Sequence, residues 1–154
     1  VADVVGTGKT YIGTALLKHL QMLHGDRPLI ICPKSLVDTW KEFCREYGIQ
    51  AEILSMGMIS QGTVDLINDP EYRNLNTVLI DESHNFRYPN TDRYKKLQPY
   101  LYGKKTILVT ATPRNNTLED IYHQIKLFHH DEETIIPIEP SNLKRFFKEG
   151  ANAI

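Results

Sequence analysis

The first ten residues carry a pattern of residue types that suits the binding of phosphate groups. Residues 6–10 read Gly-Thr-Gly-Lys-Thr. Glycines let the backbone approach an anion closely and turn its N–H groups towards it. A helix that starts near Lys9 adds a partial positive charge, Lys9 itself can reach the β- and γ-phosphates of a nucleotide, and the Thr10 hydroxyl can bind Mg²⁺. We therefore predict a phosphate-binding loop that includes Gly6, Thr7, Gly8, Lys9 and Thr10.

This loop departs from the full phosphate-loop pattern at one position. The pattern Gly-x-x-x-x-Gly-Lys-Thr places a glycine five residues before Gly8, and this chain has Asp3 there. The short Gly-Lys-Thr string also occurs in ordinary glycine-rich turns. Taken alone, residues 1–10 leave both a nucleotide site and such a turn open.

A pair of acidic residues supplies the second piece of chemistry. Asp81 and Glu82 directly follow the run Thr-Val-Leu-Ile at residues 77–80. A carboxylate at the end of a buried strand is costly unless something pairs with it, and Mg²⁺ bound to nucleotide phosphates is such a partner. We predict that Asp81 holds Mg²⁺ through water and that Glu82 orients or deprotonates the attacking water. The alternative, a surface turn with two acids, is disfavoured by the glycine-rich loop upstream.

Regular elements must position these residues. Short apolar runs predict strands over residues 29–32, 51–54, 77–80 and 106–109. Helical periodicity predicts helices over residues 9–24, 36–47, 63–68, 91–102, 118–128 and 141–148, with a loop over residues 55–62. Ser35, with Asp38 three residues later, is expected to cap the second helix, and Thr117 to cap the helix over residues 118–128.

The alternation of strands and helices predicts an α/β fold with a mainly parallel central sheet covered on both faces. In such sheets ligands bind at the carboxyl ends of the strands. Four polar segments are expected at that edge, namely residues 6–10, 33–35, 81–84 and 110–112. Their coincidence at one edge predicts a single active site there.

The composition is that of an ordinary globular domain. The chain has 154 residues, of which 18 are basic and 19 acidic, so its net charge of −1 argues neither for nor against a nucleic-acid partner. No apolar run approaches the length of a membrane span. Cys32 and Cys44 lack metal-ligand spacing and are expected to be buried free thiols in a reducing cytoplasm. Because only Val1 and Ala2 stand where a buried strand should precede the loop, we expect the chain to be a fragment with its front missing.

Taken together, these motifs resemble the Swi/Snf-type ATPases of helicase superfamily two. Residues 2–10 resemble motif I of that family, which often carries an aspartate at the position of Asp3. Residues 29–36 resemble motif Ia, residues 81–84 the DEAH-type motif II, and residues 110–113 motif III. The order and spacing of the motifs match over roughly residues 1–130.

Several details qualify the resemblance. Ser83 replaces the alanine that is usual in motif II. Trp40 and Phe43 follow motif Ia, and plain core packing is the favoured expectation for both side chains. Residues 85–87 and 115–116 are similar to a prokaryotic branch of the family.

The resemblance implies a three-layer, RecA-like P-loop NTPase domain over residues 1–154, the first lobe of a DNA-dependent ATPase that moves along double-stranded DNA. ATP and Mg²⁺ are the implied cofactors, and a second RecA-like lobe of the same protein is an implied partner. No membrane is involved, and the implied location is the cytoplasm, with association with the nucleoid allowed. Because the arginines that reach the γ-phosphate belong to the second lobe, we expect residues 1–154 alone to hydrolyse ATP barely.

The resemblance also implies a role for each motif residue. ATP binding falls to the loop residues already named and Asp3, Mg²⁺ binding to Thr10 and Asp81, and catalysis to Lys9, Asp81 and Glu82. Coupling of the nucleotide state to the DNA side falls to His84, Thr110 and Thr112. Contact with the DNA backbone falls to Lys34 and Ser35. For Lys34, a solvated surface position is an equal alternative.

Two other functions stay open. The chain could be the motor subunit of a restriction enzyme, whose motifs I to III look similar, or a stand-alone P-loop nucleotide-binding module without a DNA role. Residues 33–35 and 110–112 argue against the module, because a switch needs neither segment. The position of Trp40 after Pro33 favours the Swi/Snf type over the restriction motor.

Overall fold

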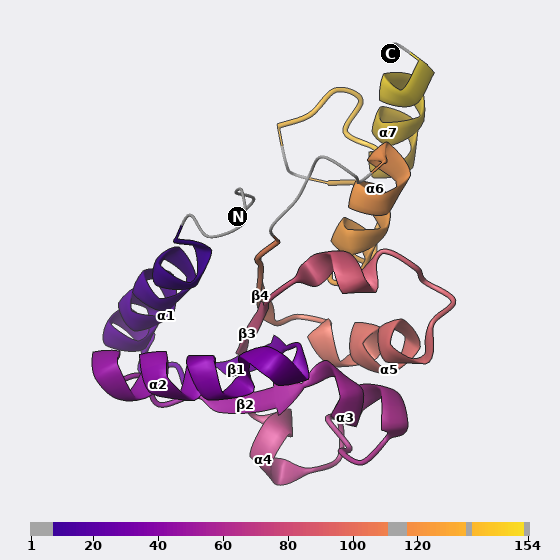
Figure 1. Ribbon diagram of the computed structural model, residues 1–154. Coiled ribbons are helices and arrows are strands. Elements are labelled where there is room, and N and C mark those ends of the chain that lie inside the picture. Colours follow the sequence, from indigo (N-terminus) through magenta and orange to yellow (C-terminus); the bar gives the residue numbers. More distant parts are fainter. Residues whose placement is uncertain (1–7, 111–116, 135–136, 153–154) are drawn as a thin grey trace.

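The centre of the fold is a four-stranded sheet in which every neighbouring pair is parallel, with strand order β2-β1-β3-β4 (Figure 1). This computed structural model describes residues 8–110, 117–134 and 137–152. The strands are β1 Leu29–Cys32, β2 Glu52–Ser55, β3 Thr77–Ile80 and β4 Lys105–Leu108. The parallel arrangement confirms the predicted sheet.

Helices cover both faces of this sheet. They are α1 Lys9–His24, α2 Val37–Tyr47, α3 Met56–Gln61, α4 Pro70–Arg73 and α5 Asp92–Leu101. On one face Ile30 and Leu79 pack with Leu17 of α1 and Trp40 of α2. On the other face alternate strand residues pack with side chains from α3, α4 and α5, among them Leu97. The predicted three layers are therefore present, and none of the described helices is both long and apolar enough to cross a membrane.

The predicted bounds hold best where a strong local signal exists. Helix α1 and strands β1 and β3 have the predicted residues, and Gly25 ends α1 in the left-handed region with a φ of 66°. Strands β2 and β4 are each displaced by one residue from the prediction.

Strand β4 was expected to be buried, but Lys105 is exposed and the next three residues are half-buried. The reason is that among the described strands β4 pairs only with β3, so it lies at an edge of the sheet.

Three local predictions between the strands are wrong. Ser35 does not cap a helix: it lies in the 3₁₀ turn Lys34–Leu36, and α2 begins after it at Val37. Residues 55–62 are not a loop but contain α3, which buries Met56 and Ile59. Residues 63–68 are not a helix but a turn whose backbone N–H groups donate to the Asp65 carboxylate. Elements of four to six residues are too short to show helical periodicity, and their packing against the sheet decides them.

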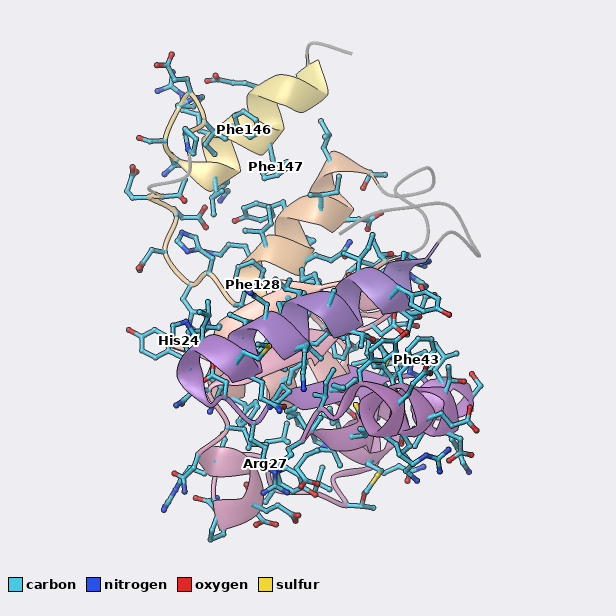
Figure 2. All side chains as sticks on the ribbon, turned by 90° about the vertical axis from the view of Figure 1, so that its left-hand side faces the viewer. His24, Arg27, Phe43, Phe128, Phe146 and Phe147 are labelled. Atoms are coloured by element: carbon cyan, nitrogen blue, oxygen red, sulfur yellow. The ribbon has the colours of Figure 1, made fainter. Side chains whose placement is uncertain are left out.

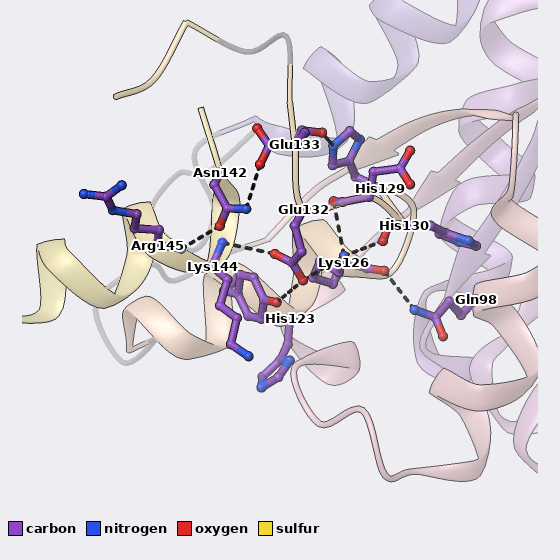
Figure 3. Close-up of polar contacts among 12 residues, drawn as sticks. Gln98, His123, Lys126, His129, His130, Glu132, Glu133, Asn142, Lys144 and Arg145 are labelled. Atoms are coloured by element: carbon purple, nitrogen blue, oxygen red, sulfur yellow. Dashed lines mark hydrogen bonds and ion pairs between the residues drawn. The ribbon is translucent and has the colours of Figure 1, made fainter. Parts of the chain in front are cut away.

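Polar contacts link the two helices of the C-terminal part, where the rings of Tyr122 and Phe147 also meet at 5.9 Å. Thr117 and Asp120 form the capping box of α6, Leu118–Lys126, as predicted for Thr117, while α7 covers Leu143–Asn152 and so begins later than predicted. The Glu132 carboxylate accepts from the Tyr122 hydroxyl at 2.7 Å and from the Lys144 N–H at 3.1 Å, and it pairs with Lys126 at 3.2 Å (Figure 3). These contacts fix the start of α7 against α6.

Two glycines test the packing of the helices. A Cβ added at Gly13 in α1 would lie 3.1 Å from Leu79 Cδ1 and 3.2 Å from Trp40 Cη2, whereas Gly57 in α3 has only Ser55 Oγ at 3.8 Å. Gly13→Ala is therefore expected to lower the free energy of unfolding by about 1–3 kcal/mol through overpacking. Gly57→Ala, the control, should raise it by about 0.5–1 kcal/mol through reduced chain entropy. Urea unfolding measures both, and changes of the same sign would contradict this account.

Candidate nucleotide-binding site

The start of α1 has the backbone conformation that a phosphate-binding loop requires. Gly8 has a φ of 94°, which an L-residue with a side chain rarely adopts, and its carbonyl accepts from the Ile12 N–H at 3.0 Å. Lys9 and Thr10 then form the first turn of the helix. The other predicted loop residues, Asp3, Gly6 and Thr7, lie outside the described residues.

The fold brings Lys9 next to the acidic pair after β3. The Lys9 Nζ atom lies 3.9 Å from Glu82 Oε1, and the two side chains are only 10% and 23% exposed. The two residues are separated by more than seventy positions in the sequence, so β3 and α1 must be packed together for this contact to form. The predicted phosphate-binding lysine and the predicted water-activating acid therefore share one site.

Asp81 is buried, with 4% of its surface exposed, and both of its carboxylate oxygens accept a hydrogen bond. The indole Nε1–H of Trp40 donates to Oδ2 at 2.9 Å, and the Glu82 N–H donates to Oδ1 at 2.8 Å. Burial raises the pKa of the Asp81 carboxyl, while these two hydrogen bonds act in the opposite direction. The carboxylate is thus held in one orientation.

Glu82 has an unusual backbone and an unsatisfied side chain. Its φ and ψ of 51° and 48° lie in the left-handed region, which costs about 1–2 kcal/mol for a residue with a side chain. Its Oε2 atom is shielded from solvent and accepts no hydrogen bond from the described residues, although His84 Nδ1 lies 3.2 Å away. A strained residue with an unfilled acceptor, placed at the carboxyl end of a central strand, indicates a functional position.

The structure also brings together two of the three predicted coupling residues. His84 Nδ1 lies 3.1 Å from Thr110 Oγ1, which follows β4. A backbone hydrogen bond also joins the segment after β3 to the segment after β4, because the Ser83 N–H donates to the Val109 carbonyl at 2.9 Å. Thr112, the third coupling residue, lies outside the described residues.

The predicted DNA-contact residues also lie at the carboxyl ends of the strands. Lys34 and Ser35 are exposed on the 3₁₀ turn that follows β1. The roles of these residues stay predictions. Cys32 at the end of β1 and Cys44 in α2 are buried free thiols, as expected, and burial raises the pKa of Cys32 to about 12.

Trp40 has a polar role that was not predicted, and Phe43 does not lie in the core as expected. Trp40 is 1% exposed and packs in the core as expected, but it also donates to Asp81. Phe43 is only half-buried, on the side of α2 that faces α1 (Figure 2), where its ring meets Tyr11 edge-to-face at 5.0 Å and stacks on Tyr47 at 6.1 Å. A polar atom on a buried aromatic residue needs a partner, and that requirement is the signal for the Trp40 contact.

A second missed contact joins the DEAH-type motif to α6. Ser83 is 1% exposed, and its hydroxyl donates to Gln124 Oε1 at 3.0 Å. Gln124 is itself buried in α6, and its amide donates to the Asp120 carbonyl at 3.3 Å. The signal was available in the serine that replaces the usual alanine, because a buried hydroxyl requires a hydrogen-bond partner.

The residues at this edge suit Mg²⁺ bound together with a nucleotide. The candidate ligands, the Asp81 carboxylate and the Thr10 hydroxyl, are oxygen donors, which Mg²⁺ prefers. No group of three or more acidic, histidine or cysteine side chains that could hold a metal exists among the described residues. Oxygens of phosphate and water would complete the coordination of Mg²⁺ beside these two residues.

Comparisons with known proteins identify the relatives of this chain. No family model matches. The "Uncharacterized ATP-dependent helicase YqhH" of Bacillus subtilis is 30% identical over 142 residues, covering 82% of this chain and 25% of YqhH. The "SWI/SNF-related matrix-associated actin-dependent regulator of chromatin subfamily A containing DEAD/H box 1" of Xenopus tropicalis is 25% identical over 99% of this chain and 18% of its own length. The chain is therefore similar to an ATP-dependent helicase and to a SWI/SNF-related protein.

A solved structure shows the same fold. The Sulfolobus solfataricus SWI2/SNF2 ATPase core in complex with dsDNA superposes with a TM-score of 0.66 over 98% of this chain, at 19% sequence identity. The four parallel strands thus form a RecA-like fold, as in that ATPase core. The chain spans 34% of that solved chain and about a quarter or less of the curated relatives named above.

The Ser83–Gln124 contact leads to a stability prediction. Ser83→Ala leaves the buried Gln124 Oε1 without its donor, so we expect the free energy of unfolding to fall by about 1–3 kcal/mol. Ser60→Ala is the matched control, because the Ser60 hydroxyl is half-buried and donates only to a carbonyl of its own helix, Met56 O. Chemical denaturation should show a change within about 0.5 kcal/mol for this control. An equal loss in both variants would mean that the contact contributes nothing specific.

Proposed function

We propose that this chain is the ATP-binding lobe of a SWI/SNF-type, DNA-dependent ATPase that couples ATP hydrolysis to movement on double-stranded DNA. The observation that carries the proposal is the Lys9–Glu82 contact of 3.9 Å at the end of β3, with the buried Asp81 beside it. A phosphate-binding lysine and two acids with different surroundings form the constellation that phosphoryl transfer needs. The names of the relatives, an ATP-dependent helicase and an ATPase core bound to dsDNA, support it.

In this proposal the positive end of α1 and the backbone before it bind the phosphates of ATP. Lys9 pairs with Glu82 when no nucleotide is present, and it contacts the β- and γ-phosphates when ATP binds. Thr10 and Asp81 hold Mg²⁺, which neutralises charge on the phosphates when it is bound. Release of Glu82 from Lys9 leaves its carboxylate to accept the proton of the attacking water.

The remaining partners belong to the same proposal. Lys34 and Ser35 contact the DNA backbone without reading its sequence, because phosphate contacts carry no base information. A second RecA-like lobe supplies the arginines for the γ-phosphate, and His84 and Thr110 couple the nucleotide site to the DNA side. A cytoplasmic location agrees with two buried cysteines that form no disulfide.

Nucleotide affinity tests the loop. Lys9→Ala removes the positive charge that Lys9 supplies to the phosphate site. We therefore expect ATP to bind about 10- to 100-fold more weakly, which corresponds to the loss of one hydrogen bond to a charged group. Titration of a fluorescent ATP analogue into the 154-residue chain measures it. Lys18→Ala is the control, since Lys18 lies on the same helix and its ammonium donates to the Gly48 carbonyl at 3.2 Å. Unchanged affinity in Lys9→Ala would show that the loop does not bind phosphate.

Hydrolysis tests Glu82. In the complete protein, Glu82→Gln keeps the shape of the side chain but removes the base, so steady-state phosphate release should fall by about 10²- to 10⁴-fold. ATP binding should stay close to that of the wild type. Glu119→Gln, at an exposed position of α6, is the control and should leave both quantities unchanged. Turnover at the wild-type rate in Glu82→Gln would exclude Glu82 as the residue that activates water.

A further inference from the structure

Trp40 is the single tryptophan of the chain. Its place in the core could be filled by a side chain that has no hydrogen-bond donor. It is 1% exposed and packs with Leu17, Ile30 and Leu79 between α1, α2 and the sheet. A leucine or phenylalanine could fill such a place. Tryptophan differs from both by its indole N–H, and here that group lies 2.9 Å from Asp81 Oδ2.

The indole ring is held in place from the opposite side. Gly13 of α1 faces it so closely that a Cβ at this residue would lie 3.2 Å from Trp40 Cη2. The ring therefore has little freedom to rotate away from Asp81. A fixed donor defines the direction of the carboxylate better than a long, flexible side chain would.

We propose that Trp40 is a positioning residue that holds the Asp81 carboxylate in the orientation in which it receives Mg²⁺. This inference rests on the proposed function. Each carboxylate oxygen can accept two hydrogen bonds or ligands, and Asp81 uses one position per oxygen for Trp40 and for the Glu82 N–H. Among the contacts of residues 8–110, 117–134 and 137–152, a position therefore remains open on each oxygen.

The choice of an indole has an electrostatic reason. A lysine or arginine at this distance would also hold the carboxylate, but its positive charge would repel an incoming divalent cation. The indole N–H stabilises the buried carboxylate as a neutral donor and leaves its full negative charge for the metal. The arrangement thus permits a deeply buried aspartate to be both ionised and oriented.

The test compares nucleotide affinity with and without Mg²⁺. Trp40→Phe keeps an aromatic ring and loses the N–H, so the ratio of ADP affinity in Mg²⁺ to that in EDTA should fall by about tenfold, as for one lost hydrogen bond to a charged acceptor. Affinity in EDTA should be unchanged. Tyr100→Phe is the matched control, because it removes a buried hydroxyl that donates to the Tyr72 carbonyl at 2.7 Å on the opposite face of the sheet. It should leave the ratio unchanged.

The variants also exclude a purely structural effect. In an Asp81→Asn background, Trp40→Phe should cause no further change of the ratio, because the two side chains act through one contact. A ratio in Trp40→Phe equal to that of the wild type, or an equal loss of affinity with and without Mg²⁺, would overturn the positioning role. Nucleotide binding that does not depend on Mg²⁺ in the wild-type chain would overturn the proposed function. The wild type therefore tests the proposed function, and Trp40→Phe tests the positioning role.

A measurement on the intact residue covers the case in which Trp40→Phe does not fold. The chain has one indole N–H and therefore one indole resonance in a ¹⁵N–¹H spectrum. Its position should shift on addition of Mg²⁺ and ADP and change much less with ADP in EDTA, and Asp81→Asn should abolish the difference. A resonance that does not respond to the metal would overturn the proposal.

Discussion

The burial of the Asp81 carboxylate is the constraint on which the rest of the site depends. A charge at the end of a buried strand is tolerated only when donors surround it, and two elements supply them: α2 through the Trp40 indole and the following turn through the Glu82 N–H. Glu82 itself has a left-handed backbone. The position of α2 and the turn after β3 therefore both serve one carboxylate.

The same turn ties the site to parts of the molecule that lie far from it. Ser83 bonds to Gln124 in α6, and the Tyr94 hydroxyl of α5 donates to the His123 carbonyl of α6 at 2.9 Å. Helix α6 in turn holds α7 through the contacts of Glu132 (Figure 3). On the other side, α2 follows directly after the turn that carries Lys34 and Ser35. Hence residues 81–84 are linked to α6 and α7 on one side and to α2 on the other.

Local patterns were sufficient for the main elements of the fold. Residues 29–32 and 77–80 are apolar throughout because both faces of a parallel sheet are covered, and such runs allow few other structures. Gly25 and the Thr117–Asp120 capping box mark helix ends by their own conformations and hydrogen bonds. The short helices α3 and α4 were not predicted, because they are too short to show helical periodicity and pack on the sheet. For α4 a local signal did exist, since the Asp69 side chain caps it by accepting from the Glu71 N–H.

The sequence by itself determined which chemistry gathers at the carboxyl ends of the strands, since in a parallel sheet the segments that follow the strands, such as residues 81–84, lie on one side of it. Tertiary structure decided how those residues are held. A hydrogen bond between Trp40 and Asp81, across 41 positions, depends on the angle at which α2 lies on the sheet, and no local pattern encodes that angle. Likewise Ser83 signalled that a buried hydroxyl needs an acceptor, but only packing selected Gln124, because any polar atom within reach would have satisfied it.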